Sequence, residues 1–160
     1  MSEGLAPQGA SVESRLEAMG LSLPVLPTAG EFLPAVTVGE LTYVSGHVPF
    51  RDGEFLYRGK VGQDLDAEAG RRAAELSVLG CLASLKSALG DLGRVRRVVK
   101  LNGYVNCSPE FGDLPKIMDA GSKLLVALFG DAGRHARTTV GVASLPFGVA
   151  VEVELVVQVG

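Results

Sequence analysis

The sequence predicts an α+β sandwich in which two long helices cover one face of a mostly antiparallel sheet. Residues 64–92 and 114–129 carry apolar side chains at helical spacing. Residues 36–45, 95–107 and 137–157 are rich in β-branched residues and are interrupted by turn signals. The elements therefore follow the order helix, strand, strand, helix, strand, helix, strand, strand, with a short helix first. A sheet covered on one face leaves the other for water or a partner.

The short first helix is expected at residues 11–19, where Ser11 can cap the first turn and a glycine follows the last one. Three prolines predict an extended connector over residues 21–34. Two β-rich runs around Gly39-Glu40 are typical of a hairpin, and residues 50–60 are expected to form a loop.

The helix at residues 64–92 begins with aspartates that can cap it and favour its positive end. Its apolar stripe, which we assign to the core, consists of Val78, Leu82, Leu85, Leu89 and Leu92. In the strand at residues 95–107, alternation predicts one apolar face, made of Val99, Leu101, Val105 and Cys107.

Composition excludes several classes of function. The net charge of −3 weighs against a dedicated nucleic-acid binder, and the one basic cluster, at residues 94–100, is expected to be a solvated strand entrance. Two cysteines are too few for a disulfide scaffold or an all-cysteine zinc site. The N-terminus has no secretory pattern, and no apolar run is long enough to span a membrane, so we expect a cytoplasmic protein.

The last two strands carry the candidate chemistry. Symmetric pairing about residues 145–148 would place Arg137 and Thr139 on the sheet face away from the helices, together with Glu152. Arginine offers a bidentate fork for a carboxylate, and a glutamate shielded from solvent can relay a proton through water. The alternative is that these are ordinary polar residues of an open sheet face, solvated or paired at an interface.

Three segments carry a resemblance to a known family. Residues 43–49 (YVSGHVP) resemble the (T)SGQ(I/V)P motif of the RidA/YjgF family, which includes imine and enamine deaminases and L-PSP endoribonuclease-like proteins. Residues 135–146 (HARTTVGVASLP) resemble its PARS-x-V-x-V-x-x-LP motif, and residues 151–154 resemble its closing IEIEA strand. We therefore divide the chain into an N-terminal extension with a short helix, residues 1–30, and a RidA-like domain of a diverged branch, residues 31–160.

The resemblance implies a chorismate-mutase-like α+β fold and a homotrimer with clefts between neighbouring subunits. It implies hydrolysis of reactive 2-imino or 2-enamino acids to 2-oxo acids and ammonia, with no metal or organic cofactor. By matched position, Arg137 would hold the carboxylate of a small ligand, Ser45 would lie in the same cleft, and Glu152 would position or activate water.

Four positions depart from the family pattern. Phe32 stands where the family has a tyrosine, Asp119 falls near a family asparagine, His47 replaces the motif glutamine and Thr139 replaces a frequent cysteine. We count all four as candidate substrate-binding positions. The substitutions leave two alternatives to an imine deaminase: a catalytically silent trimer that binds a carboxylate ligand, and, against the charge argument, a ribonuclease.

Overall fold

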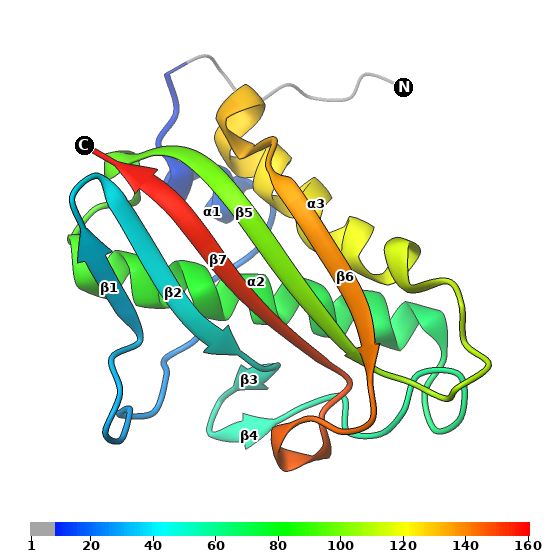
Figure 1. The fold of residues 1–160 in the computed structure, drawn as a ribbon. Helices are drawn as coiled ribbons and strands as arrows, with labels where there is room; N and C mark the ends of the chain where they lie inside the picture. Colours follow the sequence, from blue (N-terminus) through cyan, green and yellow to red (C-terminus); the bar gives the residue numbers. More distant parts are fainter. Residues whose placement is uncertain (1–8) are drawn as a thin grey trace.

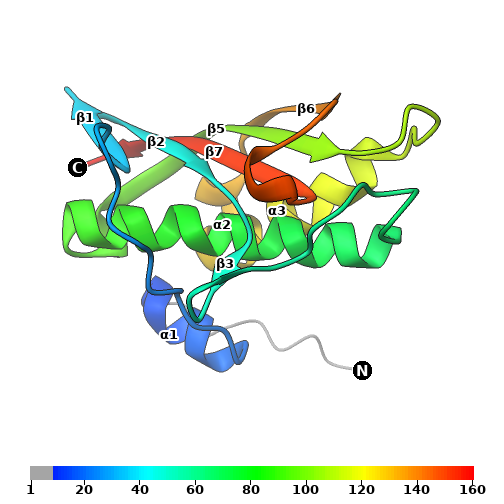
Figure 2. The same cartoon turned by 90° about the horizontal axis from the view of Figure 1, so that it is seen from below.

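A computed structural model describes residues 9–160, and in it a five-stranded sheet lies against two long helices (Figure 1). The strands are β1 (Ala35–Val38), β2 (Leu41–His47), β5 (Val95–Asn106), β6 (Ala136–Val142) and β7 (Val151–Val159), and the sheet order is β1-β2-β7-β5-β6. Helices α2 (Ala67–Leu89) and α3 (Leu114–Phe129) cover one face, and the other face is open (Figure 2). The predicted fold class is confirmed.

Helix α2 follows from its sequence at both ends and along its buried face. Asp66 caps it, since its side chain accepts a hydrogen bond from the Ala69 N–H at 2.8 Å. Gly90, at a φ of +81°, ends it. Of the predicted stripe, Val78, Leu82 and Leu85 are fully buried against the sheet and α3, and Leu89 is partly buried. Leu92 is also buried but follows the helix, which is shorter than the predicted range 64–92 at both ends.

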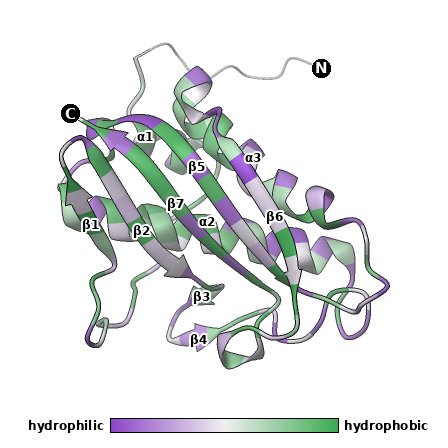
Figure 3. Cartoon of the chain, viewed as in Figure 1, coloured by the Kyte–Doolittle hydropathy of each residue, from purple (hydrophilic) through white to green (hydrophobic). Residues whose placement is uncertain are grey.

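Helix α3 packs closely on α2 and on the sheet because glycines remove side chains at the contacts. A Cβ at Gly103 of β5 would collide with the side chain of Met118 on α3, and a Cβ at Gly121 would press on Val78. The buried face of β7 completes this core with Val151, Val153, Leu155, Val157 and Val159. The alternating hydropathy of the central strands is visible in Figure 3.

The short helix α1 (Val12–Ala18) lies on the outer side of the helix layer (Figure 2). Ser11 caps it as predicted, accepting from the Ser14 N–H at 3.0 Å. Val12 and Leu16 join the core, and Arg15 donates to the Leu128 carbonyl at the end of α3 at 2.7 Å. The extension is thus packed onto the domain from residue 11 onward; its residues 1–8 lie outside the described part of the chain.

The predicted hairpin between the last two strands is wrong. β6 pairs with β5 in parallel, and β7 pairs with the other edge of β5 in antiparallel. The reason is the β5-α3-β6 crossover: a strand that returns through a helix lies parallel to its predecessor. The short helix η3 (Pro146–Gly148) belongs to a connection that carries the chain past β5 to β7.

Two smaller predictions also need correction. The loop at residues 50–60 contains a small hairpin, β3 (Phe50–Arg51) and β4 (Glu54–Phe55), around the Asp52-Gly53 turn. In β5, register shifts near Arg97 and near Val99 break the simple alternation. Val98 is therefore buried, whereas Val99 is 37% exposed. Two further short helices, η1 (Leu92–Arg94) and η2 (Gly130–Gly133), complete the fold.

The open sheet face carries more apolar surface than a solvated face requires. Four of its side chains are large, hydrophobic and at least one-third exposed: Val36, Val38, Tyr43 and Val140. Within residues 9–160, no helix is long and apolar enough to cross a bilayer.

Candidate functional site

A β-bulge in β2 shapes the first group of predicted site residues. Val44 pairs with Leu155 and His47 with Val153, so β2 advances three residues while β7 advances two. The bulge contains Ser45 and Gly46. The Ser45 hydroxyl donates to the Leu33 carbonyl at 2.7 Å, which ties the bulge to the connector that carries the exposed Phe32.

Glu152 lies beside this bulge on the open face of the sheet. Its carboxylate is packed against Gly46 so closely that a Cβ there would overlap it. Its neighbour Glu154 accepts hydrogen bonds from Asn102 at 3.0 Å and from the Tyr104 hydroxyl at 2.7 Å, whereas no described residue hydrogen-bonds Glu152. Burial, and next the charge of Glu154, raise the pKa of Glu152, so its proton is held more tightly than on an exposed glutamate.

Tyr104 donates its hydroxyl proton to Glu154 rather than facing solvent alone. This hydrogen bond, helped by burial, raises the pKa of Tyr104 to about 12. The phenol is therefore a fixed donor at neutral pH. Two donors thus occupy the Glu154 carboxylate, whereas the Glu152 carboxylate has no hydrogen-bond partner among the described residues and can accept from water.

A pocket of about 870 Å³ adjoins the bulge. Phe32, Ser45, Gly46 and His47 line it, together with Phe55 and Phe147, whose rings stack at 3.8 Å between centroids. Both nitrogens of His47 are engaged: Nδ1 donates to the Ser45 carbonyl at 2.6 Å, and Nε2 accepts from the Ser84 hydroxyl at 2.7 Å. Burial holds the pKa of His47 below its ordinary value, so His47 is a neutral side chain whose hydrogen bonds link β2 to α2.

The second group of predicted residues lies between β6 and α3. Arg137 pairs with the buried Leu101 and therefore points to the helix side of the sheet. Its Nη1 donates to Asp119 Oδ1 at 2.8 Å and to Ser122 Oγ at 3.2 Å. Nη2 reaches the Pro115 carbonyl at 3.5 Å, the outer limit of a hydrogen bond.

The guanidinium is thus held at one corner and open along one edge. Described residues engage Nη1 fully, but none hydrogen-bonds Nε, and Nη2 has only the long contact. The Nε–H and an Nη2–H form the parallel pair of donors that matches a carboxylate. Thr139, two residues along β6, has a buried hydroxyl with no partner among the described residues.

The predicted proximity of Arg137 and Glu152 in one chain is wrong. Glu152 pairs with Tyr104 and lies on the open face, whereas Arg137 lies on the helix face. Symmetric pairing of the last two strands would also set Gly141 opposite Glu152; in the structure Gly141 pairs with Val105, and the sulfur of Cys107 takes the space beside it. The seven predicted site residues therefore form two groups: Phe32, Ser45, His47 and Glu152 around the bulge, and Asp119, Arg137 and Thr139 beside α3.

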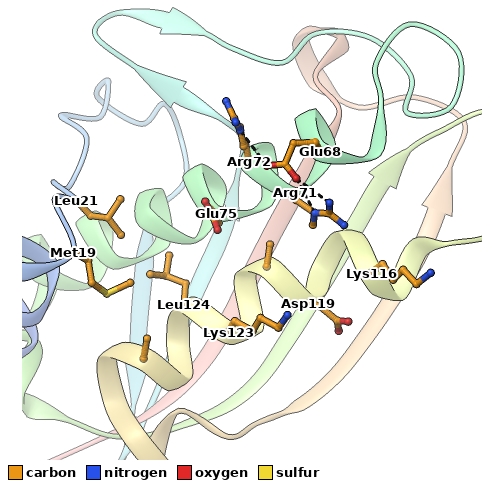
Figure 4. Close-up of a pocket in the computed structure, with 12 residues that line it drawn as sticks. Met19, Leu21, Glu68, Arg71, Arg72, Glu75, Lys116, Asp119, Lys123 and Leu124 are labelled. Carbon is orange, nitrogen blue, oxygen red and sulfur yellow. Dashed lines mark hydrogen bonds and ion pairs between the residues drawn. The ribbon is translucent and has the colours of Figure 1, made fainter. Parts of the chain in front are cut away.

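Asp119 also lines a groove of about 670 Å³ between α2 and α3 (Figure 4). Most charges there are paired locally: Glu68 with Arg71 at 2.8 Å and with Arg72 at 3.3 Å. Lys116, also in the groove, pairs with Asp113 at 3.0 Å.

Comparison with known proteins decides the family. Residues 13–159 match the family model described as "YjgF/chorismate mutase-like, putative endoribonuclease". This chain belongs to the YjgF/RidA family. Protein TCP17 of Trypanosoma cruzi is 40% identical over 149 residues, which cover 92% of this chain and 93% of the relative.

Two solved structures resemble this YjgF/RidA-family chain closely. Atu1372 of Agrobacterium tumefaciens, a protein of unknown function, has 42% identity and a TM-score of 0.88 over 93% of each chain. A "putative endoribonuclease" of Shewanella oneidensis has 35% identity and a TM-score of 0.91, covering 94% of this chain and all of its own. The expected family is confirmed.

Sequence reasoning missed Ser122 and His135 as neighbours of Arg137. Ser122 lies one turn after Asp119 on α3, and His135 precedes β6. Only the β5-α3-β6 crossover brings them together, and the predicted hairpin excluded it. Among residues 9–160, no group of three or more His, Cys, Asp or Glu side chains could hold a metal ion.

Proposed function

We propose that this protein hydrolyses reactive 2-imino or 2-enamino acids to 2-oxo acids and ammonia, in clefts between the subunits of a homotrimer. The observation that carries the proposal is the division of the site. The Nε/Nη2 edge of Arg137 is free of close partners on the helix side of the edge strand β6, and Glu152 lies on the open face with no hydrogen-bond partner among residues 9–160.

Each group lacks what the other has. One chain cannot bring the two together, but a neighbouring copy can, provided that the β6–α3 edge of one subunit meets the open face of the next. The exposed apolar side chains of that face, Tyr43 and Val140 among them, favour such burial. The family resemblance supplies the expectation of three subunits.

In this cleft the Nε/Nη2 edge of Arg137 would bind the substrate carboxylate and fix its orientation. A protonated 2-imino acid also carries a positive nitrogen, which the Asp119 carboxylate would favour. Asp119 therefore matches the electrophilic, protonated form of the substrate better than the neutral asparagine expected from the family.

Glu152 would act on water. Its raised pKa suits a group that takes a proton from water as the oxygen adds to the imine carbon. It would then return that proton to the nitrogen of the carbinolamine. The C–N bond breaks, ammonia leaves, and the hydroxyl oxygen becomes the carbonyl of the 2-oxo acid as it passes its own proton to the Glu152 carboxylate, which releases that proton to water and is ready for the next turnover.

Two observations favour the second candidate, a silent carboxylate-binding trimer. Asp119 already occupies one corner of Arg137, and Phe32 lacks the hydroxyl of the family tyrosine. Ribonuclease activity has less support, because two of the three basic side chains of β5 are hydrogen-bonded within the chain: Arg97 donates to the Arg134 carbonyl at 3.2 Å and Lys100 to Thr138 at 2.8 Å.

The test is ammonia and 2-oxo acid release from 2-imino acids generated in situ. Wild type should accelerate release over the protein-free blank, and Arg137→Ala should not. Pyruvate binding without acceleration would establish the silent trimer instead. RNA cleavage that is lost in the Arg97→Ala, Lys100→Ala double variant would establish the ribonuclease.

A further inference from the structure

A chain of hydrogen bonds leads from Arg137 back into the protein through Ser122 and His135. His135 Nδ1 lies 2.6 Å from the Gly133 carbonyl, and its Nε2 lies 3.0 Å from Ser122 Oγ. Ser122 Oγ in turn accepts from Arg137 Nη1 at 3.2 Å.

The chemistry of these groups fixes every proton in the chain. A carbonyl only accepts, so His135 Nδ1 must carry a proton and donate it. In the neutral imidazole Nε2 is then an acceptor, and the Ser122 hydroxyl must donate to it. The lone pairs of Ser122 Oγ are thereby turned toward Arg137.

We propose that Ser122 and the neutral, Nδ1-protonated form of His135 are positioning residues, which fix the Nη1 corner of Arg137 so that its Nε/Nη2 edge faces the ligand. The proposal rests on the carboxylate-binding role proposed above for Arg137. Asp119 supplies charge at the same corner, but a carboxylate accepts from many directions. Ser122 adds the second contact that sets the orientation of the guanidinium plane.

Protonation of His135 would disturb this arrangement. Nε2 would become a donor, and Ser122 Oγ would accept from two cations while its own proton turned elsewhere. Burial, and to a smaller extent the charge of Arg137, hold the pKa of His135 below its ordinary value, so the hydrogen bonds from His135 through Ser122 to Arg137 persist at neutral pH. Further charged groups adjoin this chain of hydrogen bonds: Asp119 on α3 pairs with Arg137, and Asp131 and Arg134, just before His135, pair with each other. Arg97 of β5 donates to the Arg134 carbonyl.

The first measurement follows the ¹⁵N resonance of Arg137 Nε, assigned by its loss in Arg137→Lys, as pH is lowered through the titration of His135. In wild type the arginine signal should shift with the imidazole of His135. The shift should vanish in His135→Gln and in Ser122→Ala. An arginine signal that stays constant through the His135 titration overturns the proposal.

The second measurement is pyruvate affinity by calorimetry at neutral pH. Ser122→Ala should weaken binding about three- to tenfold, the ratio expected for one hydrogen bond, whereas Ser122→Thr should retain wild-type affinity. Ser144→Ala, at an exposed loop serine, is the matched control and should have no effect. Wild-type affinity in Ser122→Ala overturns the proposal. Absence of pyruvate binding by wild type would instead refute the carboxylate-binding role of Arg137. The resonance shift would then still test whether His135 and Ser122 position the Arg137 side chain.

Discussion

Replacing Asp119 with asparagine tests whether the chain's own carboxylate tunes Arg137. Asp119 Oδ1 lies 2.8 Å from Arg137 Nη1. A ligand carboxylate on the open edge would lie about 6 Å from Asp119, across the width of the guanidinium. Two like charges at about 6 Å repel by about 0.7 kcal/mol in water and by about 2.8 kcal/mol at an effective dielectric constant of about 20.

The Asp119 side chain is 47% exposed, which places the repulsion near the lower limit, at about 1 kcal/mol. Asp119→Asn should therefore bind pyruvate about fivefold more tightly than wild type, and the gain should shrink at high ionic strength. The free amino acid alanine, used as a second ligand, carries an ammonium group beside its carboxylate. It should bind more weakly to Asp119→Asn than to wild type, because the ammonium group loses the Asp119 carboxylate as a partner. Loss of this partly exposed ion pair should lower stability by no more than about 1 kcal/mol.

Isothermal titration calorimetry with both ligands measures these changes. Asp113→Asn is the matched control, because Asp113 precedes the same helix and pairs with the exposed Lys116 at 3.0 Å. It should change neither affinity. The reasoning is refuted if Asp119→Asn binds pyruvate no more tightly than wild type, or if Asp113→Asn gives the same gain.

Three further substitutions test other parts of the account. Gly46→Ala would place a methyl group where the Glu152 carboxylate lies, so imine hydrolysis should slow by on the order of a hundredfold; an unchanged rate in the ammonia-release assay would remove Glu152 from the chemistry. Arg137→Lys keeps the charge but loses the fork, so pyruvate should bind at least about tenfold more weakly by calorimetry, and an equal dissociation constant would contradict the clamp. Burial depresses the pKa of His47 below 6.5, so the unfolded chain binds the extra proton first and the free energy of unfolding falls as pH drops below that value. In urea unfolding of His47→Gln, the dependence of the free energy of unfolding on pH should be weaker than in wild type by up to about 1.4 kcal/mol per pH unit. An identical dependence would show that a group other than His47 takes up the proton.

Much of the fold could be predicted because capping residues and apolar spacing mark the helices in the sequence. Aspartates and the apolar stripe locate α2, although the predicted range 64–92 runs past both of its ends and past Gly90, and the predicted range of α3 is the observed one. Strand pairing could not be read in the same way. Residues 137–157 look like two strands around a tight turn, but pairing partners are chosen by tertiary contacts, here by the α3 crossover that sets β6 beside β5.

The wrong pairing of the last two strands also put part of the predicted site on the wrong face of the sheet. Period-two alternation gives the two faces of a strand but does not say which of them meets the helices, so Arg137 was assigned to the wrong layer. The register shifts in β5 and the bulge in β2 add local offsets that follow from packing rather than from residue type. The motif resemblance identified all seven candidate residues without depending on register, but the division into two groups required the structure.

Subunit mixing tests the central claim most directly. Arg137→Ala and Glu152→Gln subunits should each be inactive alone, because each lacks one half of every cleft. Co-expressed at equal levels, they should regain about a quarter of wild-type imine hydrolysis, since a random assembly gives one cleft in about four an intact Arg137 and an intact Glu152 from different subunits. Mixed trimers, confirmed by mass spectrometry, that remain as inactive as the single variants would contradict a site shared between subunits.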